Sequence, residues 1–145
     1  MSCINITGTS SMDAKHPTLA VDCVVFDPRG RLLLIRRKHP PFGGQYALPG
    51  GYVEYGETTE HAAARELAEE TGLVAADVSL IGVYSDPNRD PRGHVVSIAY
   101  RVAVTAYVLR AGDDAADAEF VANWEALDLA FDHRNIVNDA RRKGS

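Results

Sequence analysis

Apolar and polar positions predict a strand–turn–strand unit early in the chain. Residues 19–26, LAVDCVVF, are β-branched and apolar and predict one strand. The DPRG sequence at 27–30 is typical of a turn, and RLLLIRR at 31–37 predicts a returning strand. Residues 38–51 are rich in proline and glycine, which argues against a regular element, so we expect an ordered loop there.

A helix is expected after this loop. Thr58 or Thr59 can act as its N-cap, and Gly72 suits the left-handed residue that ends many helices. Ala63 and Leu67 are four residues apart and therefore mark its buried side. The pattern thus predicts a helix between these two caps.

The second half of the chain predicts further strands. SLIGVYSD at 79–86 indicates a strand and PNRDPRG at 87–93 a turn. The alternation in HVVSIAYRVAVTAYVLR at 94–110 predicts a central strand, or two strands joined by a bend. We expect an acidic loop at 111–119 and a short strand, FVANW, at 120–124.

A terminal helix completes the pattern. Asp132 is its expected N-cap, with Phe131 and Ile136 spaced as a hydrophobic staple. Strands first, one helix in mid-chain and one at the end predict an α+β layered sandwich. A length of 145 residues suits one domain, which we place at 17–145 after a loose polar arm at 1–16.

Charge and composition narrow the partners. A net charge of −5 argues against binding a nucleic-acid polymer, because phosphate contacts need a basic face. It allows a small phosphorylated ligand, since a bound cation reverses the local sign. We see no secretory signal and no apolar run near the roughly 18 residues of a membrane span, so we expect a cytoplasmic protein without membrane contact. Cys3 and Cys23 lack metal-type spacing, and Cys23 suits a small buried hydrophobe.

The predicted helix gathers negative charge on one side. Glu69 and Glu70 follow Glu66 by three and four residues, so the three side chains project together. Each such pair costs a helix only about 0.2–0.5 kcal/mol, so a solvated acidic face is one interpretation. The other is a nest of oxygen ligands for Mg²⁺ or Mn²⁺, which bind carboxylates, carbonyls and water.

The wider spacing distinguishes the two interpretations. From Gly51 the chain reads G, five residues, E, seven residues, REL, one residue, EE, one residue, GL, and the pattern ends at Leu73. From ordinary residue usage, a chance match at one starting point is on the order of 10⁻⁹ to 10⁻¹⁰. Segment 51–73 resembles the Nudix box at every defined position, so the chain is similar to the Nudix hydrolase family.

The resemblance implies a fold and a metal site. Nudix domains are α/β/α sandwiches with a mixed β-sheet, on which the box forms a loop–helix–loop. The implied cofactor is Mg²⁺, with Mn²⁺ as a possible substitute. The implied metal ligands are Glu66, Glu69, Glu70 and the backbone carbonyl of Gly50.

Two further box residues have an implied structural role. Glu57 and Arg65 are expected to form an ion pair that holds loop to helix, which leaves the other three glutamates to the metal. With Glu66 and Glu70, this pair makes up the implied catalytic set. His61 stands where a glutamate often completes the helix cap. Nudix enzymes hydrolyse a nucleoside diphosphate linked to another group, and divalent ions neutralise its phosphate oxygens and acidify bound water.

The flanking segments bear on the substrate. RRKHPPFGGQYALPGG at 36–51, SDPNRDPRGHVVSIAY at 85–100 and LAFDHRNIVNDA at 129–140 look like the bacterial and archaeal ADP-ribose pyrophosphatase branch. This likeness implies hydrolysis of ADP-ribose to AMP and ribose 5-phosphate. The candidate substrate-binding residues are Arg37, Tyr46, Arg89, Arg92 and His94.

The flanking residues have more than one possible interpretation. Each arginine, including Arg36, can be an exposed surface cation. Phe42, Tyr46 or Tyr84 would suit stacking on adenine. Because they bear no motif of their own, these side chains are candidates on residue type and position alone.

The polar residues near the predicted turns are also ambiguous. Asp86 and Asp90 suit turns in which the side chain bonds to local backbone. A histidine at a strand end, such as His94, is usually structural. His133 is expected to be a first-turn helix residue rather than a catalytic one.

The general base has two possible sources. Glu66 in the box is the candidate that we favour. The acidic loop supplies the others, although a solvated loop explains its composition equally well; they are Asp113, Asp114, Asp117 and Glu119.

Two other functions remain to be weighed. One is a binding module that senses such nucleotides without turnover, as in Nudix-derived regulators of NAD metabolism, but a sensor has little need for all four box glutamates. The other is a housecleaning pyrophosphohydrolase for oxidised or non-standard nucleoside triphosphates. In each case the expected partner is a small nucleotide. Relatives in this branch are often homodimers, so we expect a homodimer.

Overall fold

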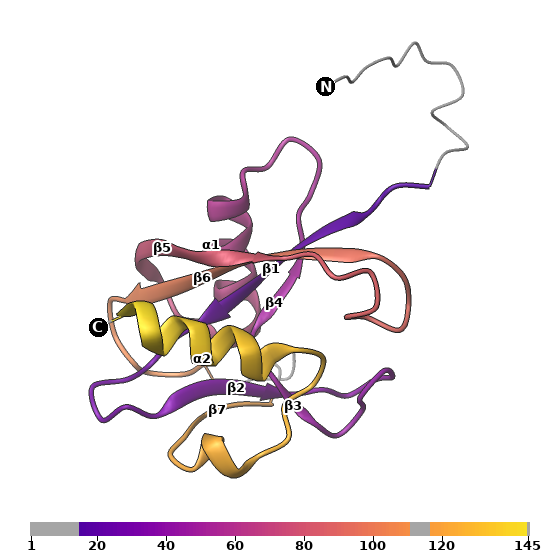
Figure 1. Ribbon diagram of the computed structural model, residues 1–145. Helices are drawn as coiled ribbons and strands as arrows, with labels where there is room; N and C mark the ends of the chain where they lie inside the picture. The colour runs from indigo at the N-terminus through magenta and orange to yellow at the C-terminus, as the bar shows by residue number, and fades with distance from the viewer. Residues whose placement is uncertain (1–14, 111–116, 145) are drawn as a thin grey trace.

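The computed structural model of the protein describes residues 15–110 and 117–144, so most of the predicted arm at 1–16 lies outside it. Runs of strands are followed by single helices along this part of the chain, with α1 in mid-chain and α2 at the end (Figure 1). In chain order the elements are β1 (Thr18–Val24), β2 (Leu32–Arg36), β3 (Tyr46–Ala47), β4 (Gly50–Tyr52), α1 (Thr59–Thr71), β5 (Ala75–Tyr84), β6 (Val95–Val104), β7 (Asp117–Val121), the 3-10 helix η2 (Trp124–Ala126) and α2 (His133–Gly144).

Two sheets form the centre of the molecule. The larger has the order β4-β1-β6-β5, with β1 parallel to β6 and the other neighbours antiparallel, so it is a mixed sheet. The smaller is antiparallel and has the order β3-β2-β7. The predicted α+β class is therefore confirmed.

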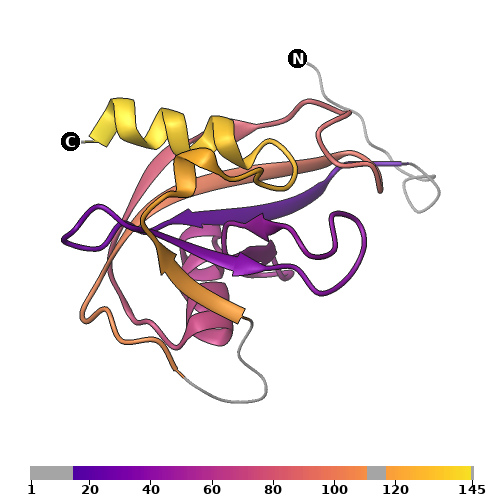
Figure 2. The ribbon, with the colours of Figure 1, turned by 90° about the horizontal axis from the view of Figure 1, so that it is seen from below.

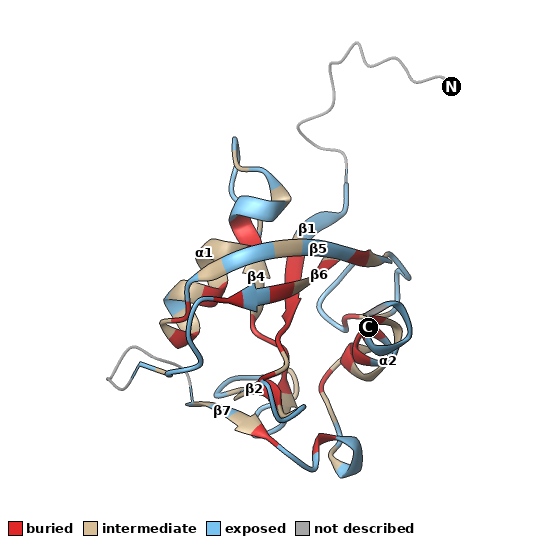
Figure 3. Ribbon diagram, turned by 90° about the vertical axis from the view of Figure 1, so that its left-hand side faces the viewer, coloured by how far each residue is buried: buried red, intermediate tan, exposed pale blue. Residues whose placement is uncertain are grey.

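Successive side chains of β1 point to opposite faces and so serve two cores. Val21 and Cys23 pack in the cluster that contains Ala63 and Leu67 of α1. Val24 instead belongs to the cluster that contains Ile136 of α2. The two helices therefore cover opposite sides of the strands, as Figures 2 and 3 show. This arrangement matches the predicted α/β/α sandwich.

Both predicted caps of α1 are present. Thr58 has extended backbone angles, and its side chain accepts a hydrogen bond of 3.1 Å from the N–H of His61. Gly72 has a φ of 81°, and its N–H donates to the carbonyl of Ala68. Cys23 is buried as expected, and its Sγ lies 3.5 Å from the carbonyl oxygen of Ala63.

Three predicted boundaries are wrong. The loop expected at 38–51 contains β3 and β4, because pairing with β2 and β1 makes strands of segments too short to have a periodicity. β5 begins at Ala75 rather than residue 79, since its pairing with β6 crosses two register shifts that disrupt the alternation. β6 ends at Val104, well before residue 110.

The end of the chain needs a further correction. β7 begins at Asp117, within the expected acidic loop, and ends at Val121. Trp124 lies in η2 rather than in a strand, and its buried ring packs 6.2 Å from that of Phe26. The terminal helix begins at His133 as predicted, but the side chain of Asp132 bonds to Arg89.

Candidate active site

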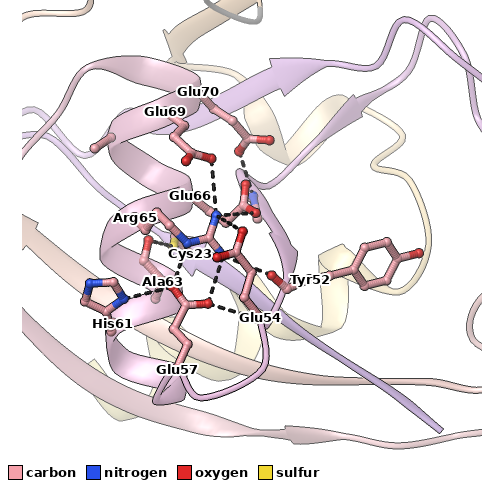
Figure 4. A network of polar contacts seen from close by, with 12 residues as sticks. Cys23, Tyr52, Glu54, Glu57, His61, Ala63, Arg65, Glu66, Glu69 and Glu70 are labelled. Atoms are coloured by element: carbon pink, nitrogen blue, oxygen red, sulfur yellow. Dashed lines mark hydrogen bonds and ion pairs between the residues drawn. The ribbon is translucent and has the colours of Figure 1, made fainter.

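The predicted ion pair between Glu57 and Arg65 is present. Nε of Arg65 donates to Glu57 Oε2 at 2.6 Å, and Nη2 donates to Oε1 at 2.9 Å (Figure 4). The same Nη2 donates to the carbonyl of Tyr52 in β4 at 3.0 Å. Arg65 therefore ties the loop before α1 and strand β4 to the helix.

Arg65 also contacts two of the three glutamates that we expect it to leave to the metal, whereas Glu70 is free of it. Its Nη1 donates to Glu66 at 3.1 Å and to Glu69 at 3.2 Å. Glu69 lies one helical turn after Arg65, which brings the two side chains together on the helix surface. The side chain of Glu69 is 60% exposed, so it lies at the rim of the glutamate cluster.

Two glutamates of α1 lie against the glycine pair that begins β4. The N–H of Gly50 donates to Oε1 of Glu70 at 2.9 Å. A Cβ atom at Gly51 would overlap the carboxylate of Glu66, so this carboxylate packs on the Gly51 backbone. The absence of side chains at Gly50 and Gly51 lets two acidic groups approach one short stretch of backbone.

These carboxylates lie in surroundings that oppose their charge. Burial, and then the charge of Glu66, raise the pKa of Glu70 to about 8. Burial also raises the pKa of Glu66, although the bond from Arg65 partly offsets this. By contrast, the hydrogen bonds from Arg65 lower the pKa of Glu57 to about 2. Glu66 and Glu70 thus form a pair that a cation would stabilise, because desolvation and repulsion both disfavour two bare negative charges.

The oxygen atoms of this cluster could form part of a site for a divalent cation. Within residues 15–110 and 117–144, no three His, Cys, Asp or Glu side chains are gathered closely enough to enclose a metal ion. Mg²⁺ usually takes only one or two carboxylates and completes its shell with water and phosphate oxygens. The carboxylates of Glu66 and Glu70, which meet the backbone of Gly51 and Gly50, suit such a partial, all-oxygen site.

A cavity of about 220 Å³ adjoins this cluster. Glu70, Gly50 and Gly51 line it, and so do the predicted substrate residues Arg37, Arg89 and Arg92. Segments from β1, β2, β3, β4, β6, the loop at 85–94 and the start of α2 also contribute; their lining residues are Ala20, Val21, Asp22, Ile35, Ala47, Leu48, Tyr52, Asp90, Val95, Phe131 and His133.

Arg37 and Arg92 converge on one aromatic ring in the cavity. Their guanidinium carbons lie 5.0 and 5.6 Å from the centre of the Phe131 ring. Arg92 is paired with Asp90 at 2.8 Å, whereas Arg37 has no ion-pair partner among the described residues. Burial, and then the charge of Arg92, lower the pKa of Arg37, so this cation lacks the compensation that Arg92 has. It is the pocket cation best suited to an incoming anion.

Phe131 itself is held in an unusual conformation. Its φ is 54° and that of Phe42 is 61°, which are strained values for bulky residues. The two rings pack edge to face with 4.8 Å between their centres. Such strain is often found at binding sites, where the surrounding structure imposes it. Phe42 thus supports the ring of Phe131 in the cavity.

The floor of the cavity is a buried polar network. Asp22 accepts a hydrogen bond from Ser97 at 2.5 Å and lies 3.4 Å from Nε2 of His133. Burial raises the pKa of Asp22 and lowers the pKa of His133. Arg89 donates twice to Asp132, at 2.9 and 2.6 Å. The guanidinium group of Arg89 is therefore already paired with a carboxylate of the protein.

Two predicted substrate residues do not line the cavity. Tyr46 accepts a hydrogen bond from Arg36 and donates one to Glu119 at 2.9 Å. His94 is exposed, and its Nε2 lies 3.0 Å from the carbonyl of Ser85. Tyr84, a stacking candidate, donates to Asp139 instead.

The other sequence candidates have local roles or cannot be placed. Asp86 and Asp90 accept backbone N–H groups two residues on, as expected of turn residues. Nδ1 of His61 lies 2.8 Å from Oε2 of Glu57. Asp117 and Glu119 belong to β7, paired with β2, and neither lines the cavity. Asp113 and Asp114 fall outside the described residues.

Sequence reasoning missed Asp22, Tyr52 and Phe131 and treated His133 as a plain helix residue. One signal was available, because Asp22 is the single charged residue in the apolar run 19–26. Phe131 was interpreted only as part of a staple. No local pattern marks a residue whose role depends on another element.

Comparison with known proteins identifies the family of this chain. The family model described as NUDIX domain matches residues 16–140. The chain belongs to the NUDIX domain family. Its fold is accordingly the Nudix fold, and segment 51–73 is its Nudix box. Neither helix within the described residues is long and apolar enough to cross a membrane.

Three relatives illustrate the likeness. The ADP-ribose pyrophosphatase of Methanocaldococcus jannaschii is 52% identical over 127 residues, which are 88% of this chain and 75% of that protein. The ADPR responsive transcriptional repressor NtrR of Acinetobacter baylyi is 33% identical over 137 residues, and the match spans 54% of its length. The NUDIX domain of Shewanella oneidensis NrtR, solved in complex with ADP ribose, superimposes with a TM-score of 0.82 at 26% identity and covers 93% of both chains.

Proposed function

We propose that this Nudix chain is a divalent-metal-dependent hydrolase that cleaves ADP-ribose to AMP and ribose 5-phosphate. The observation that carries the proposal is one cavity lined both by Glu70 and Gly50 and by Arg37, a cation with no ion-pair partner among the described residues. The cavity therefore combines ligands for a metal with a contact for an anion. Similarity to an ADP-ribose pyrophosphatase and to a domain solved with ADP ribose supports this substrate.

The metal end is built from the Nudix box. Glu66, Glu70 and the Gly50 carbonyl would hold Mg²⁺, or Mn²⁺ in its place, with Glu69 at the rim. When bound, the cation neutralises the diphosphate oxygens and lowers the pKa of water. Arg65 keeps Glu66 in place and, through Glu57 and the Tyr52 carbonyl, fixes the helix against β4.

The substrate end is built from the flanking segments. Arg37 binds the negative charge of the diphosphate or of the sugar phosphate being released, and Arg92 adds a second positive charge beside it. Phe131 provides an apolar wall beside both cations. Arg89 acts indirectly, because its bonds to Asp132 hold the 85–94 loop on the start of α2.

Glu66 is our candidate for the general base. Its carboxylate packs on the backbone of Gly51, which lines the cavity, so it lies close to the place where substrate and water would meet. Loss of a general base typically lowers turnover by about 10²–10⁴-fold. Glu66→Gln turnover within about tenfold of the wild type would exclude this role.

A substrate panel tests the proposal. Purified protein with Mg²⁺ is incubated separately with ADP-ribose, with 8-oxo-dGTP and with unmodified nucleoside triphosphates, and products are identified by mass spectrometry in H₂¹⁸O. We expect AMP and ribose 5-phosphate from ADP-ribose, with a kcat/KM at least about tenfold above that for any triphosphate, since a tenfold ratio corresponds to about 1.4 kcal/mol of transition-state binding. EDTA should stop the reaction.

The alternatives give different results in the same panel. Preferred cleavage of oxidised triphosphates would identify a housecleaning enzyme. Binding of ADP-ribose without hydrolysis at any divalent-ion concentration would identify a sensor, as the likeness to NtrR allows.

Two further points stay predictions. A cytoplasmic location is expected because the sequence shows no secretory signal and no membrane span, and a homodimer is expected from the family resemblance. Light scattering that gives about twice the chain mass of 15.7 kDa would support the homodimer, and a value near one chain mass would contradict it.

A further inference from the structure

The first residue of α2 is buried between strand β1 and the segment that leads into β4. His133 is only 4% exposed, and its Nδ1 accepts a hydrogen bond of 3.0 Å from the backbone N–H of Leu48. A neutral imidazole that accepts at Nδ1 carries its proton on Nε2. Nε2 lies 3.4 Å from Oδ1 of Asp22 in β1. One side chain therefore bridges the backbone before β4 and the central strand β1.

The segment that His133 contacts joins the two sheets. Leu48 and Pro49 connect β3 of the smaller sheet to β4 of the larger one. The carbonyl of Pro49 accepts from the N–H of Cys23 at 2.8 Å, and the N–H of Gly50 donates to Glu70. Three consecutive residues are thus fixed by α2, β1 and α1 in turn.

The carboxylate of Asp22 packs against the same segment. A Cβ atom at Gly50 would lie 2.7 Å from Oδ1 of Asp22, so the carboxylate packs directly against Gly50. Ser97 of β6 donates to the other oxygen of this carboxylate. The position of Gly50 therefore depends on a carboxylate that Ser97 and His133 hold in place.

We propose that His133 is a positioning residue for the metal end of the cavity. It holds the backbone at 48–50 so that Gly50 meets Glu70, and in this way it couples α2 to the Nudix box on the opposite side of the sheet. The inference rests on the proposed function only in taking Gly50 and Glu70 as metal ligands. Residues that orient metal ligands typically change metal affinity by about 10–100-fold when they are removed.

Two His133 variants and one control separate positioning from stability. His133→Leu removes both polar contacts. His133→Asn places an amide oxygen near the position of Nδ1 and so retains an acceptor for the N–H of Leu48. Val137→Ala, in the buried core under the same helix, destabilises α2 but removes none of the hydrogen bonds that hold residues 48–50. The measurements are Mn²⁺ dissociation constants by electron paramagnetic resonance, thermal midpoints, and amide exchange of Leu48 and Gly50 in the metal-free protein.

The expected results differ between the variants. His133→Leu should weaken Mn²⁺ binding by about tenfold or more and should lose protection of the Leu48 and Gly50 amides. His133→Asn should restore both, and Val137→Ala should lower the thermal midpoint while Mn²⁺ binding stays near that of the wild type. An unchanged Mn²⁺ constant in His133→Leu, or equal weakening in Val137→Ala, overturns the role of His133. No Mn²⁺ uptake by the wild type would instead overturn the proposed function, and amide protection would still test whether His133 holds the segment.

Discussion

At the scale of single residues, the bond between Arg65 and Glu57 makes stability depend on pH. The pKa of Glu57 is about 2 in the fold, against 4.5 for an unperturbed glutamate. The unfolded chain therefore takes up this proton first as the pH falls. The stabilisation from Glu57 is full above pH 4.5 and is lost as the pH falls towards 2.

Glu57→Gln should accordingly be less stable than the wild type at about pH 6, and the difference should shrink towards about pH 3. Urea unfolding of both proteins at the two pH values measures this. Glu60→Gln, exposed on the first turn of the same helix, is the matched control. A difference that is as large at the lower pH as at the higher one would contradict the role of Arg65.

Neighbouring arginines at the end of β2 and just after it give a second residue-scale prediction. Arg37 lines the cavity, whereas Arg36 lies 4.4 Å over the ring of Tyr46 and donates to the carbonyl of Gly44. A hydrogen bond to a charged group contributes about 1.5–3 kcal/mol, so Arg37→Ala should lower kcat/KM for ADP-ribose by roughly ten- to a hundredfold. Arg36→Ala should stay within about threefold of the wild type. Steady-state kinetics on both variants decides, and equal losses would remove Arg37 from the substrate site.

At the scale of elements, the short strands β3 and β4 set the position of the metal end. The sequence predicts α1 well, because Thr58, Gly72 and the box spacing are local signals. It misses β3 and β4, because strands of two and three residues have no measurable periodicity and exist only through pairing with β2 and β1. Proline and glycine around them favour a loop. Tertiary pairing overrides that local preference.

A substitution at Gly50 tests how closely these strands pack. A Cβ atom there would overlap the carbonyl oxygen of Val21 and crowd Asp22, so Gly50→Ala must push β4 away from β1. Overpacking of this kind costs about 1–3 kcal/mol, and the displaced backbone should also weaken Mn²⁺ binding. Gly43→Ala is the control, because its Cβ would have no neighbour closer than 3.5 Å. Thermal melts and Mn²⁺ titration test both, and a Gly50→Ala protein as stable as Gly43→Ala would refute the packing argument.

At the scale of the whole molecule, the cavity joins parts of the chain that carry very different sequence signals. The metal end could be predicted, since all its side chains lie within the single segment 51–73. The polar network at the floor of the cavity could not be predicted, because Asp22 and His133 meet only when α2 packs on the sheet that contains β1. Tyr46 and His94 stay predicted substrate residues. Neither lines this cavity: Tyr46 donates to Glu119, and Nε2 of His94 lies 3.0 Å from the carbonyl of Ser85.

The proposed function depends most directly on hydrolysis that requires both the metal and Glu70. The decisive measurement is the rate at which AMP forms from ADP-ribose in wild-type protein and in Glu70→Gln, each with Mg²⁺ and with EDTA. We expect AMP only when Mg²⁺ is present, and a rate at least about a hundredfold lower in Glu70→Gln, because the variant removes one ionised ligand at the site of charge development. AMP formation in EDTA, or a Glu70→Gln rate within about tenfold of the wild type, would contradict the assignment of this cluster as a metal-dependent active site.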